Sequence, residues 1–179
     1  MQYYRKLNLR FAALELANDP SRLVFHNAYK TPQKYGLRLQ KNKPFISVPN
    51  LTYKLREEDA QHVVSDLPKK LLELEVPEVW VLNICPTDSD EPTMLAPHRD
   101  IVRMCGINIY FDTHGERTIY YECENNKIAE RDSFVAKDGE CYVLDLDAVH
   151  AVELVPPHVR KAVSISFIRT PYREVVRYL

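Results

Sequence analysis

Residues 103–111 read R-M-C-G-I-N-I-Y-F, and apolar residues occupy every second position through most of this stretch. Successive side chains of a β-strand point to opposite faces of the sheet. One face of the expected strand carries the large apolar side chains and a thiol, namely Cys105, Ile107, Ile109 and Phe111. The other face carries Gly106, Asn108 and Tyr110. The alternation therefore predicts a strand with one face in a hydrophobic core and a more polar face opposite.

Further strands are expected on both sides of this stretch. They cover residues 78–85, 118–123, a segment around Ile128, 140–146 and 162–168, with turn residues at 112–115 and 137–139. Short strands without intervening helices indicate an antiparallel sandwich or barrel. Two helices are expected earlier, over residues 56–67 and 69–75, because the first begins with acidic residues that suit a helix N-terminus.

Length and charge exclude several classes of protein. A chain of 179 residues suits one domain, which is expected to cover residues 1–179. Within it, residues 1–77 are expected to support the fold from the N-terminal side, and residues 78–170 to form the β core. Lys and Arg number 24 and Asp and Glu number 25, so bulk charge does not attract nucleic acid, and a nucleic-acid partner is not expected. No stretch approaches the roughly 20 apolar residues of a membrane span, so no membrane association is expected.

The four cysteines predict no metal or redox motif of their own. Cys85, Cys105, Cys123 and Cys141 form no C-x-x-C pair, which disfavours a zinc ribbon or a thioredoxin-type site. Residues 1–10 carry charges and no apolar run, so no signal peptide is expected. Reduced thiols and a cytoplasmic location are the simplest expectation, with Cys105 and Cys141 in the core.

The segment His98-Arg99-Asp100 places an imidazole and a carboxylate two residues apart, on the same side of an extended chain. His150 follows the expected strand 140–146 and offers a third ligand. Two histidines and one carboxylate on one face of a metal ion form the facial triad of non-haem Fe(II) oxygenases. Zinc hydrolases use the same ligand types, and an isolated H-x-D is also common in surface loops.

Arg160 begins the expected strand R-K-A-V-S-I-S-F, ten residues after His150 and beyond Pro156-Pro157. If the chain reverses at the two prolines, Arg160 returns beside the metal ligands. A guanidinium there can bind a carboxylate through two hydrogen bonds, which suits a metal-bound 2-oxo acid with a second, distal carboxylate. A surface cation is the alternative.

Together these segments resemble the 2-oxoglutarate- and Fe(II)-dependent dioxygenase superfamily. The resemblance rests on H98-R-D100, on residues 142–152 around His150 and on residues 160–167, and it covers roughly residues 79–170. It implies a mainly β fold with N-terminal helices (α+β), in which the core is a double-stranded β-helix, also called a jelly roll, that is cupin-like. The chain would then be a single oxygenase domain.

The resemblance also implies roles for individual residues. His98, Asp100 and His150 would ligate Fe(II), and Arg160 would bind the distal carboxylate of 2-oxoglutarate. Residues 103–112 resemble the strand after H-x-D in prolyl-hydroxylase-type members, where a tyrosine at the Tyr110 position shares that carboxylate. Tyr110 fits a core aromatic nearly as well. Further candidates are Asn108 and Ser164 for the cosubstrate pocket, and Arg99 and Arg103 for a substrate carboxylate.

The implied reaction is hydroxylation of a C–H bond in a small molecule, such as an amino acid or other small acid, or in a protein side chain. O₂ would be consumed and 2-oxoglutarate converted to succinate and CO₂. Nucleobase demethylation is disfavoured, because Ser166 stands where repair demethylases carry a second arginine. Residues 87–95 are expected as a polar loop, either a lid or a plain surface loop. Two alternatives remain: a non-catalytic cupin-like metal-binding or sensor module, and a zinc- or manganese-dependent isomerase or hydrolase.

Overall fold

A computed structural model describes residues 2–9, 14–30, 49–86, 94–100, 102–124 and 127–179. Its strands form two antiparallel sheets. The larger, seven-stranded sheet has the order β1 (Tyr4–Leu7), β9 (Cys141–Asp145), β6 (Cys105–Phe111), β11 (Arg160–Phe167), β4 (Glu78–Ile84), β3 (Pro49–Leu55) and β2 (Leu23–Lys30). The smaller, four-stranded sheet has the order β5 (Met94–His98), β10 (His150–Glu153), β7 (Arg117–Glu124) and β8 (Lys127–Val135).

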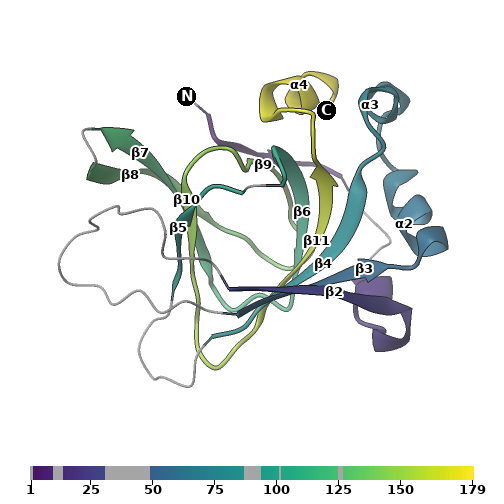
Figure 1. Ribbon diagram of the computed structural model, residues 1–179, viewed down its shortest axis with the longest axis horizontal. Coiled ribbons are helices and arrows are strands. Elements are labelled where there is room, and N and C mark those ends of the chain that lie inside the picture. The colour runs from purple at the N-terminus through teal and green to yellow at the C-terminus, as the bar shows by residue number, and fades with distance from the viewer. Residues whose placement is uncertain (1, 10–13, 31–48, 87–93, 101, 125–126) are drawn as a thin grey trace.

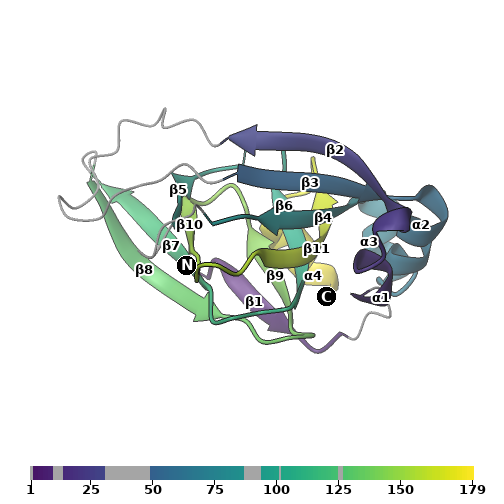
Figure 2. The same ribbon diagram turned by 90° about the horizontal axis from the view of Figure 1, so that it is seen from below.

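From β4 onward the chain passes repeatedly between the two sheets. Strands β4, β6, β9 and β11 belong to the larger sheet, and β5, β7, β8 and β10 to the smaller one. Figure 2 shows the smaller sheet to the left of the view, facing the larger sheet. This order is consistent with a jelly roll, in which two sheets face each other across a shared interior.

The helices are few and short: α1 (Leu14–Ala17), the 3-10 turn η1 (Pro20–Arg22), α2 (Glu57–Val64), α3 (Lys69–Leu74) and α4 (Tyr172–Tyr178). Helices α2 and α3 lie within the two ranges expected from the sequence. Because β1, β2 and β3 also come from the first 77 residues, the chain is mainly β, and an α+β assignment is not supported. Among the described residues, no helix is long and apolar enough to cross a membrane.

The alternation in residues 103–111 is confirmed by β6, whose two faces meet different neighbours. The apolar face packs in a core cluster that includes helical residues, with Cys105, Ile107, Ile109 and Phe111 beside Val63, Leu71 and Val175. The helices therefore cover the outer face of the larger sheet (Figure 1). Burial of each large apolar side chain contributes about 1.5–3 kcal/mol to stability. The apolar face of β6 therefore stabilises the packing of the larger sheet against the helices.

Most strands after residue 77 lie where the sequence placed them, but several were not expected. Strands β4, β6, β7, β9 and β11 match the expected ranges and β8 contains Ile128, as expected, whereas β1, β2, β3, β5 and β10 were missed. Met94 and Leu95, expected in the polar loop 87–95, are instead buried residues of β5, because each packs in a small core cluster, Leu95 with Val152 and Met94 with Ile119. Residues 87–93 lie outside the described part of the chain. All four cysteines are free, and Cys105 and Cys141 are buried as expected.

Glu75 holds the segment that follows β11 against the end of α3. Glu75 is buried, with 6% of the residue exposed. It accepts hydrogen bonds from the N–H groups of Ile168, Arg169 and Thr170 at 2.9, 3.1 and 2.9 Å, and from Thr170 Oγ1 at 2.8 Å. One side chain therefore satisfies several backbone donors between β11 and α4, and buried donors of this kind are costly to leave unpaired.

Candidate metal centre

The two histidines of the candidate centre lie opposite each other in the smaller sheet. His98 ends β5, His150 begins β10, and the two residues are register partners in the antiparallel pair. Asp100 follows two residues after His98. Its N–H donates to the Leu146 carbonyl at 3.0 Å, in the segment that leads from β9 to His150. Strand pairing and this hydrogen bond thus bring together ligands that are about fifty residues apart in the sequence.

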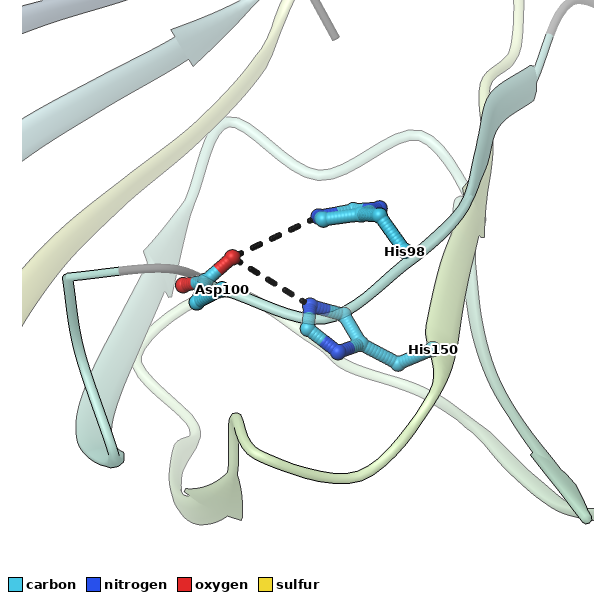
Figure 3. A group of neighbouring side chains, drawn as sticks. All are labelled: His98, Asp100 and His150. Carbon is cyan, nitrogen blue, oxygen red and sulfur yellow. Dashed lines mark ion pairs between the residues drawn. The ribbon is translucent and has the colours of Figure 1, made fainter. Parts of the chain in front are cut away.

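The three side chains converge on one point (Figure 3). Asp100 Oδ1 lies 3.5 Å from His98 Nε2 and 3.9 Å from His150 Nε2. The three candidate ligand atoms all lie within 4.8 Å of one another. The side chains are 8–13% exposed, so the group is shielded yet reachable. These three residues could therefore hold one metal ion.

The second nitrogen of each imidazole determines which atom is offered to a metal. His98 Nδ1 lies 2.7 Å from the Ala96 carbonyl oxygen, and His150 Nδ1 lies 2.9 Å from the Ala148 carbonyl oxygen. A carbonyl oxygen only accepts hydrogen bonds, so Nδ1 carries the proton in both rings. Each Nε2 then has a free lone pair directed toward Asp100, which is the tautomer that metal-binding histidines adopt.

The charge states also suit a cation. Burial, reinforced by the neighbouring His98, lowers the pKa of His150 to about 4, so this imidazole is neutral at pH 7. Burial alone would raise the pKa of Asp100, but the Arg103 guanidinium and the two imidazoles outweigh it and hold the pKa well below its usual range. Two imidazoles with one carboxylate form the 2-His-1-carboxylate donor set typical of divalent iron.

The triad lines a pocket between the two sheets. Its empty volume is about 530 Å³, part of which is open to solvent. Other polar side chains in its lining are Arg103, Asn108, Tyr110, Thr118 and Arg160. The pocket therefore combines metal-ligating side chains of the smaller sheet with a cation from the larger one.

Arg160, the first residue of β11, is a buried cation, and only 6% of it is exposed. Its Nη2 donates to Thr118 Oγ1 at 2.7 Å, and its Cζ lies 4.9 Å from the centre of the Tyr110 ring. Among the described residues, Nη1 has no hydrogen-bond partner and no carboxylate forms an ion pair with this guanidinium. Because a buried, unpaired charge is costly, the arrangement favours an anionic ligand.

Asn108 and Tyr110 lie on the pocket side of β6, as the alternation predicted. Asn108 Nδ2 donates to the Tyr110 hydroxyl at 3.4 Å, while Asn108 Oδ1 is buried without a hydrogen-bond partner. The Tyr110 ring also makes edge contacts with Phe134 and Tyr142. Tyr110 thus combines the two expected placements, since its ring belongs to the aromatic core and its side chain lines the pocket.

The remaining candidates occupy different surroundings. Ser164 is buried, but its hydroxyl accepts a hydrogen bond from Arg103 Nη1 at 3.0 Å, and it does not line the pocket. Arg103 was expected to contact a substrate carboxylate, but its guanidinium forms an ion pair with Asp100 Oδ2 at 2.5 Å. Arg99 is exposed and outside the pocket lining, so its contact with a substrate stays a prediction.

Sequence reasoning missed Thr118, which orients Arg160 from the opposite sheet. Its position at the start of an expected strand was visible, but its pairing with Arg160 was not, because the two residues are 42 positions apart. The Leu146 carbonyl was missed for a similar reason: it positions Asp100 through the backbone, and a backbone group has no signature in a sequence.

Comparison with known proteins identifies no family. No family model and no curated protein matches the chain. A Pseudomonas putida prolyl-4-hydroxylase is 11% identical, with 95% of this chain and 94% of that chain covered and a TM-score of 0.47. The Drosophila melanogaster CENP-C cupin domain is 9% identical, with 83% and 78% covered and a TM-score of 0.41. A predicted oxalate decarboxylase from Thermotoga maritima is 14% identical, with 66% and 82% covered and a TM-score of 0.23.

Proposed function

We propose that this protein is an Fe(II)- and 2-oxoglutarate-dependent dioxygenase. It would hydroxylate a C–H bond of a small acid, such as an amino acid, or of a protein side chain. In this proposal residues 1–179 form one oxygenase domain, and the strands within residues 78–170 form a double-stranded β-helix. The single observation that carries the proposal is the buried guanidinium of Arg160, which lines the same pocket as the His98, Asp100 and His150 triad.

The charges of the pocket support a dicarboxylate as cosubstrate. Apart from the two imidazoles, which bind a metal in their neutral form, the charged lining residues are Asp100, Arg103 and Arg160, and their charges sum to +1. A divalent cation would raise this sum to +3, and a dianion would return it to +1. Because net charge is costly in a shielded site, a metal ion and a dicarboxylate should each strengthen the binding of the other.

In the proposed site each residue has one task. His98, Asp100 and His150 would hold Fe(II), whose donor preferences their free Nε2 and carboxylate atoms match. When bound, iron supplies O₂ activation, and the conversion of 2-oxoglutarate to succinate and CO₂ accompanies oxygenation of the substrate. Arg160 would bind the distal carboxylate with its unpartnered Nη1, and the Tyr110 hydroxyl would donate to it.

The decisive experiment compares wild-type protein with Arg160→Ala. Anaerobic Fe(II) protein is titrated with 2-oxoglutarate while its absorption spectrum is recorded, and succinate is then measured after O₂ is added. Two charge-assisted hydrogen bonds contribute roughly 3 kcal/mol or more, so the variant should bind 2-oxoglutarate at least about 100-fold more weakly. Arg169→Ala removes an exposed arginine just after β11 and is the matched control.

The outcomes separate the candidate functions. A wild-type protein that shows no spectral change with 2-oxoglutarate and forms no succinate contradicts the proposal. If that wild-type protein still binds a divalent metal, the alternative functions are a metal-binding module or a zinc- or manganese-dependent enzyme. If Arg160→Ala binds 2-oxoglutarate as tightly as wild type does, the cosubstrate is bound elsewhere.

Thr118→Val tests whether the smaller sheet orients Arg160. Valine keeps the shape but cannot accept the hydrogen bond from Nη2, which leaves a buried donor unpaired. The loss of about 1–1.5 kcal/mol should raise the Kd for 2-oxoglutarate roughly 5- to 10-fold without changing metal affinity. Isothermal titration of 2-oxoglutarate into Mn²⁺-loaded protein, and of Mn²⁺ into metal-free protein, measures the two affinities. Thr118→Ser, which keeps the hydroxyl, should bind like wild type. Equal affinity of Thr118→Val and Thr118→Ser would remove Thr118 from this role.

The substrate itself stays a proposal. Because Arg103 is engaged by Asp100, Arg99 is the remaining candidate for a contact with a substrate carboxylate. A nucleic-acid substrate is not proposed, since the net charge is −1 and Ser166 replaces the second arginine of the repair demethylases.

A further inference from the structure

Arg103 lies directly beside the candidate metal ligands, and three groups hold its guanidinium. Nη2 lies 2.5 Å from Asp100 Oδ2, Nη1 donates to Ser164 Oγ at 3.0 Å, and Cζ lies 5.2 Å from the centre of the Trp80 ring. Trp80 and Ser164 are register partners on β4 and β11, so they form one platform in the larger sheet. The platform fixes the direction in which Arg103 meets Asp100.

The two carboxylate oxygens of Asp100 consequently have different surroundings. Oδ1 faces the Nε2 atoms of His98 and His150, whereas Oδ2 faces Arg103. We propose that Arg103 is a positioning residue that holds Oδ2 away from the metal, so that Asp100 binds the ion through Oδ1 alone. This inference rests on the metal site of the proposed function.

A carboxylate bound through one oxygen determines how many positions on the ion stay open. Carboxylates bind divalent cations through one or both oxygens. On an octahedral ion, two imidazoles and one carboxylate oxygen occupy three positions and leave three. In the proposed function a chelating 2-oxo acid would need two of these positions and O₂ the third, so a second oxygen from Asp100 would leave too few. Arg103 therefore keeps one reactive position free.

The same contacts argue against a substrate role for Arg103. Only 11% of its side chain is exposed, and both Nη atoms already have partners. A substrate carboxylate would have to displace Asp100 or Ser164 to reach it. Arg99, four positions earlier, is exposed and makes a matched comparison, because it is the same residue type in the same segment.

The test counts water molecules on bound Mn²⁺ by water-proton relaxation, with no cosubstrate present. Wild type, Arg99→Ala and Arg103→Lys should each show about three coordinated waters, because the metal keeps three open positions when Asp100 binds through one oxygen. Arg103→Ala should show about two, or should lose Mn²⁺ while still folded. If Arg103→Lys keeps the wild-type number of waters and Arg103→Ala does not, the cationic group positions the carboxylate, and a general packing effect is not the cause.

The outcomes distinguish this inference from the proposed function. If Arg103→Ala binds Mn²⁺ with wild-type affinity and about three waters, Arg103 does not position Asp100. If wild type itself binds no Mn²⁺, the metal site of the proposed function is wrong. If Arg103→Ala does not fold, Ser164→Ala takes its place, because it removes only one hydrogen bond from the guanidinium. An average water count below that of wild type supports the inference, and an unchanged count contradicts it.

Discussion

Replacing His150 by alanine should abolish tight metal binding. The substitution removes one of three ligands, and loss even of a group that merely orients a ligand costs about 10- to 100-fold in metal affinity. We therefore expect the affinity for Fe(II) or Mn²⁺ to fall by more than 100-fold. Ion binding to the folded state raises the thermal midpoint, so the midpoint of wild type should rise with added Mn²⁺ and that of His150→Ala should not.

Two further variants keep this test specific. His62→Ala removes an exposed histidine of α2 and should leave the Mn²⁺-dependent shift unchanged. Asp100→Asn retains an acceptor for Arg103 but removes the ligand charge, so it should lose most of the shift without unfolding the protein. A wild-type shift in both His150→Ala and Asp100→Asn would place the ion somewhere other than the triad.

Glu75→Gln should cause a large loss of stability for a change outside the pocket. The carboxylate accepts bonds from three N–H groups and the Thr170 hydroxyl, and an amide can accept on one side only. Leaving buried donors unpaired costs about 1–3 kcal/mol for each group, so we expect a loss of roughly 2–4 kcal/mol. Urea unfolding measures it, and Glu73→Gln, an exposed neighbour on α3, should change stability little.

The same carboxylate should make the protein sensitive to acid. Burial alone would raise the pKa of Glu75, but the Thr170 hydroxyl and the backbone N–H groups outweigh it and lower the pKa below its usual 4.5. The unfolded state therefore takes up the proton first as the pH falls. The ionised Glu75 carboxylate therefore stabilises the folded state fully above about pH 4.5, and this stabilisation is lost as the pH falls below that value. The difference in unfolding free energy between wild type and Glu75→Gln should shrink from pH 7 to pH 3, and a constant difference would contradict this cause.

Strands with a clear alternation or a long apolar run could be predicted from the sequence, and the others could not. The β6 stretch shows a period of two over seven residues, because its two faces meet different surroundings. Strand β10 has only four residues, and β5 contains Pro97, which normally argues against a strand. Strand β10 pairs with β5 on one side and with β7 on the other, and such pairing depends on residues far away in the chain.

Much of the candidate site was also visible in the sequence, because its residue types are rarely combined by chance. The spacing of His98, Asp100 and His150 predicted a group that the structure does bring together. The role of Arg103 could not be predicted in the same way. An arginine three residues after an aspartate is common, and only the platform of Trp80 and Ser164 shows that its guanidinium faces the carboxylate.

The hydrogen bond from Arg160 to Thr118 connects the two sheets, and it has a consequence for ligand size. His98 and His150 belong to the smaller sheet and Arg160 to the larger, and facing sheets lie about 10 Å apart. A diacid held at one end by the metal and at the other by Arg160 must match this separation. In the proposed function, side chains that line the pocket, such as Leu144 and Ala162, would therefore determine which carbon-chain length fits. Enlarging Ala162 should shift the preference among four-, five- and six-carbon diacids, although no ligand-binding atom is changed.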